Sequence, residues 1–369
     1  MPELPEVEAM RGLMERHAVG RTIRKVFARE SGGGPRDGKF DDKVIGEGVK
    51  EPAFVDALLG RRVVAAKRLG KQLWLELGGE GPHLLVHCGM TGSLAVDGVK
   101  RFNFESFSVD DAWPPRFTKL QLELGGGSGG SVAKVAFADP RRFGKILLRR
   151  DPAGEAPIAE LAADPLVAPP ALATFVAVLG RSSMPVKSLL LDQGKVVCGV
   201  GNWIADEVLH KAGVHPAAPA NTLSDRQIAE LRDAVLFVVR AAVKVDADAA
   251  RFPKDWLFHF RWGVGPNSSG VTMPDGSLLA FGEVGGRTTA FVPSRQHMGE
   301  KAAADTVGEA ATTPKRRRAS GGEAPSPAKR RVPAASARKR PAAAAGTTAV
   351  SAFAVPLRKR PAGAAMDLA

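Results

Sequence analysis

The sequence contains very little cysteine, which excludes two kinds of architecture. Cys88 and Cys198 are the only cysteines among 369 residues. A disulfide framework is therefore excluded, and the low count suits a reducing compartment. A zinc site with four cysteine ligands cannot form within the chain.

The sequence also lacks long hydrophobic runs. No apolar stretch is long enough to span a bilayer, so no membrane association is expected. The first residues are acidic and periodic rather than basic and then apolar, so we expect no secretory signal. The hydrophobic fraction of 44% is sufficient for the cores of two ordinary domains.

Positive charge is concentrated towards the carboxyl end. Residues 301–369 contain 14 Lys or Arg and 4 Asp or Glu, which places +10 of the net charge of +13 there. This segment is rich in Ala, Pro, Ser and Gly, so we expect a disordered basic tail over residues 300–369. Its basic clusters indicate nuclear import signals or nonspecific DNA contacts, with a merely solubilising tail as the alternative. We therefore expect an import receptor as a partner and a nuclear location.

The periodicity of the remaining chain predicts an α+β protein. Residues 6–18 have helical periodicity, and alternating strand patterns follow, for example at 71–77 and 118–124. We expect residues 1–150 to form a domain with an amino-terminal helix and an antiparallel β-sandwich.

The second half of the folded chain has different patterns. Residues 151–250 have helical periodicity, and Ser224 with Gln227 forms a capping box at the start of one helix. Residues 251–299 contain turn signals between short strands, which predicts a β-hairpin region.

The first eight residues, MPELPEVE, combine a proline with three carboxylates. Removal of Met1 would leave Pro2 with a secondary amine, which can attack a sugar carbon and form an iminium that acts as an electron sink. Glu3, Glu6 and Glu8 are candidate acids and bases within one helical turn. An ordinary helix start is the alternative, because proline suits the first helical position and acidic residues favour a helix amino end.

A second informative string is Gly199-Val200-Gly201-Asn202. Glycines just before a helix allow close backbone approach and expose free N–H groups to a phosphate, and Asn202 adds a side-chain donor. An ordinary glycine-rich turn is the alternative. Lys71 lies at the start of a predicted strand, where by itself it indicates an ordinary exposed lysine.

Two further strings, His87-Cys88-Gly89-Met90 and Asp139-Pro140-Arg141-Arg142-Phe143-Gly144, suit an enzyme that extracts a base from the DNA stack. Met90 and Phe143 are suitable wedges for the resulting hole, and Arg141 can bond to the orphaned partner base. Arg142 can clamp a phosphate. Core packing with a solvated arginine pair is the alternative. His83 and His87 have no third ligand nearby, so we expect structural roles for them.

Together these strings resemble those of the formamidopyrimidine-DNA glycosylase and endonuclease VIII family, DNA repair enzymes that remove oxidised bases. The resemblance implies that Pro2 attacks the sugar C1′ of an everted nucleotide and that Glu3 is the general acid. It further implies that Glu6 orders water or assists proton transfer, and that Lys71 assists phosphate contact and elimination.

The resemblance also implies DNA-binding roles. Met90, Arg141 and Phe143 match the residues that fill the void in the formamidopyrimidine branch. Asn202, with help from Lys187, matches the contact to the backbone of the damaged strand in a helix–two-turn–helix motif.

The chain departs from the bacterial members at two places. No cysteine lies near residues 285–292, so this segment resembles the zincless finger of plant and fungal members. The resemblance implies that Arg287, at the tip of the hairpin, reaches a phosphate. Residues 246–262 are rich in aromatics where bacterial enzymes have a glycine-rich loop over 8-oxoguanine. We favour packing under the hairpin for these aromatics over stacking on a base.

We therefore expect a monomeric bifunctional DNA glycosylase and abasic-site lyase that acts on damaged duplex DNA without a cofactor or metal. Formamidopyrimidines are the expected substrates, with 8-oxoguanine and hydantoins left open. A noncatalytic protein of the same fold that binds damaged DNA is the main alternative. A tautomerase that uses a terminal proline as a base is a second one.

Overall fold

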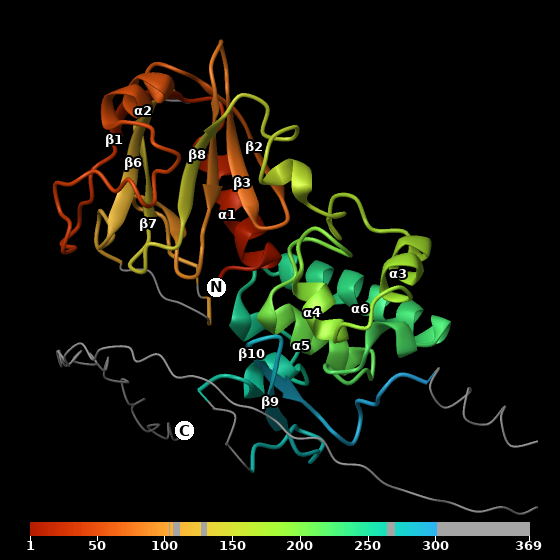
Figure 1. Cartoon of the computed structure of the whole chain (residues 1–369). Helices are drawn as coiled ribbons and strands as arrows, with labels where there is room; N and C mark the ends of the chain where they lie inside the picture. Colours follow the sequence, from red (N-terminus) through yellow and green to blue (C-terminus); the bar gives the residue numbers. More distant parts are fainter. Residues whose placement is uncertain (103, 106–110, 127–130, 264–269, 301–369) are drawn as a thin grey trace, which may run out of the picture. The chain divides into compact units, whose positions relative to one another are not determined.

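A computed structural model describes residues 1–102, 104–105, 111–126, 131–263 and 270–300 (Figure 1). Within these residues the chain forms helices and antiparallel sheets, which confirms the predicted α+β class. The prediction of a disordered tail falls, from residue 301 on, outside the described residues. In the part of the chain that is described, no helix has both the length and the apolar character needed to cross a bilayer.

Eight strands form two antiparallel four-stranded sheets, in agreement with the predicted sandwich. One sheet has the order β1-β6-β7-β5 and the other has the order β2-β3-β4-β8. The strands are β1 Thr22–Phe27, β2 Val63–Leu69, β3 Gln72–Leu77, β4 His83–His87, β5 Ser93–Val96, β6 Thr118–Gly125, β7 Ala133–Ala138 and β8 Lys145–Arg149. The short helix α2 (Glu51–Leu58) lies between β1 and β2 in the sequence.

The sandwich core joins both sheets to helix α1 (Leu4–His17). The alternating leucines of β3 and β6 are buried in it, as predicted from their period of two. The apolar stripe of α1 that the sequence predicts is buried in the same cluster, namely Val7, Met10 and Met14.

The helical part consists of α3 (Leu172–Leu179), α4 (Val186–Leu191), α5 (Asn202–Lys211) and α6 (Asp225–Val243) (Figure 1). The capping box predicted at the start of α6 is present, because Ser224 Oγ accepts from Gln227 N and Gln227 Oε1 accepts from Ser224 N. The buried stripe of α6 packs against α5 and α3.

The aromatic segment 246–262 packs into this helical core. Phe252, Trp256 and Phe258 are buried around the indole of Trp203, at ring-centroid distances of 5.6, 6.4 and 5.0 Å. Leu257 instead contacts the hairpin side. The prediction of packing is confirmed, although most of the aromatics lie against α5 rather than under the hairpin.

The predicted hairpin consists of β9 (Ala280–Val284) and β10 (Arg287–Phe291). Gly285 and Gly286 form its two-residue turn with φ values of +59° and +70°, which glycine adopts without steric cost. A small apolar cluster that includes Leu279 and Val292 supports it. Within the described ranges, no three His, Cys, Asp or Glu side chains gather as a set of metal ligands.

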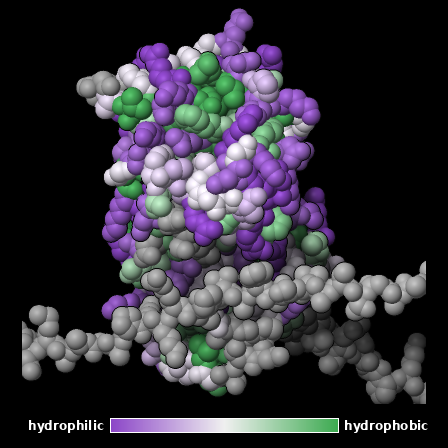
Figure 2. Space-filling view, turned by 90° about the vertical axis from the view of Figure 1, so that its left-hand side faces the viewer, coloured by the Kyte–Doolittle hydropathy of each residue, from purple (hydrophilic) through white to green (hydrophobic). Residues whose placement is uncertain are grey.

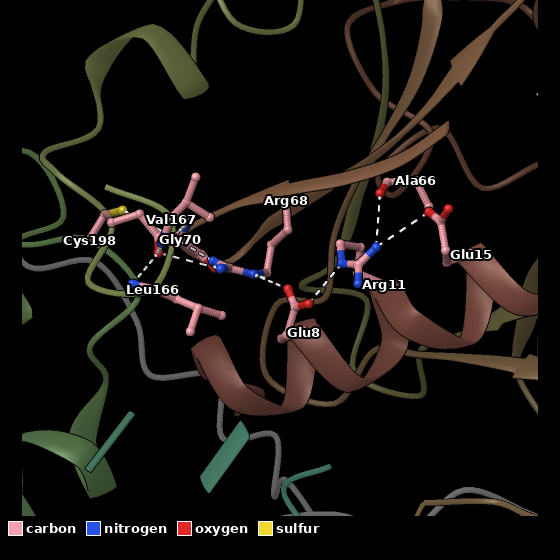
Figure 3. A network of polar contacts seen from close by, with 10 residues as sticks. Glu8, Arg11, Glu15, Ala66, Arg68, Gly70, Leu166, Val167 and Cys198 are labelled. Carbon is pink, nitrogen blue, oxygen red and sulfur yellow. Dashed lines mark hydrogen bonds and ion pairs between the residues drawn. The ribbon is translucent and has the colours of Figure 1, made fainter. Parts of the chain in front are cut away.

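A buried ionic network connects α1, β2 and the segment after β8 (Figure 3). Arg68 Nε donates to Glu8 Oε2 at 2.8 Å, and the guanidinium also pairs with Asp164, whose side chain is fully buried. Asp164 further accepts the backbone N–H of Gly70 at 2.7 Å and of Leu166 at 2.8 Å. The prediction of Glu8 as a catalytic acid or base is wrong, because both of its oxygens are engaged by arginines.

Figure 2 views the molecule from the side of β1 and β6 and shows hydrophilic residues over most of this face, with separate hydrophobic groups among them. Phe27 and Leu59 are 44% and 46% exposed. Single exposed apolar side chains are ordinary on folded proteins, so they indicate no site by themselves.

Replacing Asp164 with Asn should destabilise the protein strongly. The change keeps the shape of the side chain but removes one charge from a buried pair, which typically costs about 3–5 kcal/mol in the free energy of unfolding. Urea denaturation measures this loss. Asp233→Asn is the matched control, because its ion pair is exposed and contributes only about 0–1 kcal/mol.

The same pair should make stability depend on pH. Burial alone would raise the pKa of Asp164, but the hydrogen bonds and charge of Arg68 outweigh it and lower the pKa below the ordinary 3.8. The stabilisation is therefore fully present above that value and is lost as the pH falls through the folded-state pKa. Equal losses of unfolding free energy in Asp164→Asn and Asp233→Asn would contradict a stabilising role for the buried Arg68–Asp164 pair.

Candidate active site at the amino end

The amino ends of α1 and α5 meet through one carboxylate. Glu3, the residue before α1, is 2% exposed. Its Oε2 accepts from Gly201 N at 2.8 Å and from Ile204 N at 3.2 Å, and its Oε1 accepts from Trp203 N at 2.9 Å. Glu3 thus satisfies three of the backbone donors that the first turn of α5 leaves unpaired.

Gly199 and Gly201 are required because the two helix ends approach so closely. A Cβ on Gly201 would lie 2.2 Å from Glu3 Cδ, and one on Gly199, where φ is +87°, would lie 2.6 Å from Leu4 Cδ1. The expectation that these glycines expose N–H groups to a phosphate is corrected here, since the donors at the helix start bind Glu3 instead.

Lys71 joins the same turn from the β-sandwich. It lies with Gly70 in the two-residue connection between β2 and β3, and its Nζ donates to Val200 O at 2.8 Å. Burial lowers the pKa of Lys71, while the charges of Glu3 and Glu6 raise it. Lys71 is thus a buried amine near two carboxylates rather than the exposed lysine of the alternative interpretation.

Glu6 connects Glu3 to α5. Its Oε2 accepts from Glu3 N at 3.0 Å, and its Oε1 accepts from Trp203 Nε1 at 3.1 Å. Burial, followed by the charge of Glu3, raises the pKa of Glu6 to about 7. Burial also raises the pKa of Glu3, against the opposing effects of Lys71 and the N–H groups of α5. A raised pKa favours the protonated form of a carboxyl group, which is the form that a general acid needs.

The terminal amine belongs to this cluster. Burial lowers the pKa of the Met1 amino group, Lys71 and Arg141 lower it further, and Glu3 with Glu6 raises it. Pro2, the next residue, is buried. The structure therefore brings together all four residues that the sequence predicts as catalytic: Pro2, Glu3, Glu6 and Lys71.

The three residues predicted to fill the void, Met90, Arg141 and Phe143, lie on two adjoining wedge loops. One follows β4 and carries Met90, and the other precedes β8 and carries Arg141 and Phe143. A Cβ on Gly89 would lie 2.3 Å from the carbonyl carbon of Phe143, so the loop of Met90 touches the loop of Phe143. Phe143 is 47% exposed, and the guanidinium of the exposed Arg141 lies 5.1 Å from its ring centroid. Met90 is partly exposed. The core-packing alternative is therefore wrong for Phe143.

Asp139 holds the two wedge loops together, a role that the sequence interpretation missed. The buried carboxylate accepts from Thr91 Oγ1 and from Gly144 N, each at 2.7 Å. The available signal is its position immediately before the motif of residues 140–144, where an aspartate can accept bonds from a following turn.

Arg142 is oriented differently from its neighbour Arg141. Its Nε and Nη2 each donate to the buried carboxylate of Asp41 at 2.8 Å. The expectation of a guanidinium available to clamp a phosphate is corrected, because the fork of Arg142 is occupied within the protein.

Lys187 also lies away from solvent. Its side chain is fully buried, and its Nζ lies 2.6 Å from Asp206 Oδ1 and 2.7 Å from Thr289 Oγ1. Lys187 is thus held by internal partners, and its predicted help to Asn202 in binding the DNA backbone stays a prediction. The residue ties α4 to α5 and to the hairpin.

Asn202 and Arg287 lie at the junction of α5 with the hairpin. Asn202 Nδ2 donates to Thr288 O at 2.9 Å. Arg287 is exposed at the hairpin tip, and its charge is one of the factors that lower the pKa of Lys71. The DNA contacts of Asn202 and Arg287 stay predictions.

His83 and His87 have structural partners. His83 Nδ1 accepts from Leu77 N at 3.0 Å, and His87 Nδ1 accepts from Gly89 N at 3.3 Å. Burial lowers the pKa of His87 to about 4, so the ring is neutral. This agrees with the structural roles expected from the sequence.

Comparison with family models agrees with this geometry. Residues 1–146 match the formamidopyrimidine-DNA glycosylase N-terminal domain, and residues 161–254 match the formamidopyrimidine-DNA glycosylase H2TH domain. The two matched segments contain every residue of the cluster described above except those of the hairpin.

Similar proteins include curated formamidopyrimidine-DNA glycosylases. The protein of Arabidopsis thaliana is 38% identical over 300 residues, which cover 81% of this chain and 71% of the relative. The protein of Nocardioides sp. is 38% identical over 233 residues, which cover 63% of this chain and 70% of the relative.

Solved structures show the same fold. The MutM (Fpg) protein of Thermus thermophilus is 30% identical with a TM-score of 0.59, and the match covers 81% of this chain and all of that one, 100%. The Lactococcus lactis enzyme, solved bound to DNA with an abasic site, matches with a TM-score of 0.61 at 24% identity, over 80% of this chain and 99% of that one. The family models and the Arabidopsis relative show that this chain belongs to the formamidopyrimidine-DNA glycosylase family.

Proposed function

We propose that this chain is a bifunctional DNA glycosylase and abasic-site lyase that removes oxidised purines from duplex DNA. The observation that carries the proposal is the convergence of the amino terminus, Glu3, Glu6 and Lys71 at the start of α5. Membership of the family supports duplex DNA as the partner. Formamidopyrimidines are the proposed substrates, because residues 246–262 hold packed aromatics where, by the family resemblance, bacterial members have the glycine-rich loop over 8-oxoguanine.

The proposed nucleophile is the amine of Pro2 after removal of Met1. Burial lowers the pKa of the Met1 amino group, and a Pro2 amine freed at the adjoining position would lie beside the same buried groups, which favours its unprotonated form. A secondary amine that forms a bond to C1′ and loses its one N–H proton yields an iminium, which is charged without needing protonation, so the electron sink is present once the sugar ring has opened.

The two carboxyl groups and Lys71 divide the proton transfers. Pro2 N forms a bond to C1′ as the base leaves with the electron pair of its bond to C1′, and the N–H proton that Pro2 loses goes to the departing base. Glu3 then gives its proton to the sugar ring oxygen as the C1′–O4′ bond breaks, and the nitrogen lone pair completes the iminium. The buried Lys71 ammonium then stabilises the Glu3 carboxylate that remains. Glu6 keeps Glu3 oriented through the Glu3 N–H and acts as a proton reservoir.

The iminium allows strand cleavage. Loss of a C2′ proton expels the 3′ phosphate by β-elimination, and a second proton loss expels the 5′ phosphate by δ-elimination. Water then releases the sugar remnant from Pro2, which leaves a one-nucleotide gap. Met90, Arg141 and Phe143 fill the hole in the duplex, and Asn202 with Arg287 contacts the backbone.

We further propose a monomer that is imported into the nucleus through the basic clusters of residues 315–360. Four such clusters in a segment with +10 net charge support this location.

The amine at position 2 should form the covalent link to DNA. Pro2→Gly, or a form with an extra residue before Pro2, should lose borohydride trapping on DNA with an abasic site, because no free secondary amine remains. Gel shift of the trapped complex measures this. A removable amino-terminal tag provides the control, since its cleavage to expose Pro2 should restore trapping. Undiminished trapping in the blocked form would remove Pro2 as the nucleophile, and no trapping in any form would favour a noncatalytic DNA-binding protein.

Glu3→Gln should separate base removal from strand cleavage. The amide keeps the shape and one acceptor for α5 but cannot supply the proton, so base excision should fall by about 10²–10⁴. Cleavage of a preformed abasic site should be retained in part, as measured in single-turnover assays on the two substrates. The melting temperature controls for loss of the helix contact. Equal loss of both reactions in a folded variant would contradict the acid role.

Arg287→Ala should weaken binding to duplex DNA and reduce the slope of log K against log salt by about 1, because one phosphate contact is lost. Fluorescence anisotropy at several salt concentrations measures the slope. Arg226→Ala, at the start of α6 and paired with Glu230, is the control for removal of a charge elsewhere. An unchanged salt slope in Arg287→Ala would show that the hairpin tip makes no phosphate contact.

A further inference from the structure

A buried ionic cluster lies beneath the wedge loop and has no part in the chemistry described above. Glu30, Asp41 and Lys119 have side chains that are at most 1% exposed. Lys119 Nζ pairs with Glu30 and lies 3.2 Å from Asp41 Oδ2. Arg142, in the wedge loop, completes the cluster with its two bonds to Asp41.

The geometry of the cluster depends on Arg142. Lys119 and Arg36 also pair with Asp41, at 3.2 and 3.7 Å, but both face Oδ2, whereas Arg142 binds Oδ1 as well. Burial alone would raise the pKa of Asp41, but hydrogen bonds from Arg142 and Lys119 lower it to about 2. Movement of Arg142 to a DNA phosphate would leave the buried Oδ1 of Asp41 without its guanidinium donor, and an unpaired buried carboxylate oxygen costs more than an exposed ion pair returns.

The fork of Arg142 also maintains an uncommon backbone conformation. Arg142 has a φ of +56°, in the left-handed region that non-glycine residues rarely adopt without support. The residues on either side, Arg141 and Phe143, are exposed. The left-handed backbone of Arg142, with its side chain bound to Asp41, leaves Arg141 and Phe143 at the surface.

The segment that carries Asp41 is attached to the wedge loop at further points. Ile146 N donates to Val44 O at 2.8 Å, and Gly46 N donates to Ile146 O at 3.1 Å. Lys43 Nζ lies 5.4 Å from the ring centroid of Phe143. The two segments are therefore joined on both sides of Phe143.

We propose that Asp41 is a positioning residue that, through its fork with Arg142, holds Arg141 and Phe143 in the arrangement that fills the hole left by an everted nucleotide. The inference rests on the proposed function, because it assigns a role within the same reaction. In this proposal Arg142 stabilises the conformation of the wedge loop and does not bind a phosphate.

The test compares Asp41→Asn and Arg142→Lys with the wild type. A duplex with 2-aminopurine opposite a tetrahydrofuran abasic analogue reports wedge insertion by fluorescence. Arg142→Lys keeps the charge but cannot form the fork. Both variants should lose most of the fluorescence change, and single-turnover excision of a formamidopyrimidine should slow by about tenfold, the cost of one charged hydrogen bond. The double variant should be no slower than either single one, because both remove the same interaction.

Asp42→Asn is the matched control, since it removes the same charge from the adjacent exposed position. It should match the wild type in fluorescence and excision. Melting temperatures identify an unfolded variant. If Asp41→Asn does not fold, Arg142→Lys alone tests the proposal, because Arg142 is partly exposed and its replacement disturbs the core less.

Two results would overturn the inference. One is normal fluorescence and excision in Asp41→Asn and Arg142→Lys. The other is tighter DNA binding with a steeper salt slope in Asp41→Asn, as expected if Asp41 withholds Arg142 from a phosphate. A wild type that binds DNA and gives the fluorescence change but excises no lesion would instead count against the proposed function.

Discussion

The contact between the Glu3 carboxylate and the free N–H groups at the start of α5 is the interaction on which the site depends. It satisfies donors that would otherwise be buried without partners, and it fixes the residue next to the proposed nucleophile. A carboxylate held this way is both a helix cap and a candidate acid. The second use is possible because burial raises its pKa, against the stabilising effect of Lys71 and the helix donors.

Other features of the fold follow from this contact. The approach of Glu3 and Leu4 leaves no room for side chains at positions 199 and 201, which accounts for both glycines. Lys71 reaches the same turn because it lies in the tight connection between β2 and β3, and Asp164 holds that connection by accepting from Gly70 N. The buried Arg68–Asp164 pair is thus part of the support of the site, although it lies outside it (Figure 3).

The basic residues of the DNA-binding region have distinct tasks that residue type does not reveal. Arg141 and Arg287 are exposed, whereas Lys187 and Arg142 are committed to Asp206 and Asp41. A buried or partly exposed cation is stabilised by a buried anion, so Lys187 is matched by Asp206 and Arg142 by Asp41. The resulting ion pairs position loops and the hairpin, while the exposed bases are available for phosphate and base contacts.

Local patterns in the sequence determined the secondary structure and the short motifs, because helix and strand periodicity, capping boxes and glycine turns act over a few residues. The stripe of α1, the start of α6 and the turn of the hairpin needed no distant information, and the string at residues 1–8 pointed to Pro2, Glu3 and Glu6. The tertiary structure alone decided the partner of each charge. Asp41 is separated from Arg142 by 101 positions, and Glu3 from Gly201 by 198. Periodicity says nothing about such pairs, since they depend on which elements pack together and on the cost of burying a charge without its counterpart.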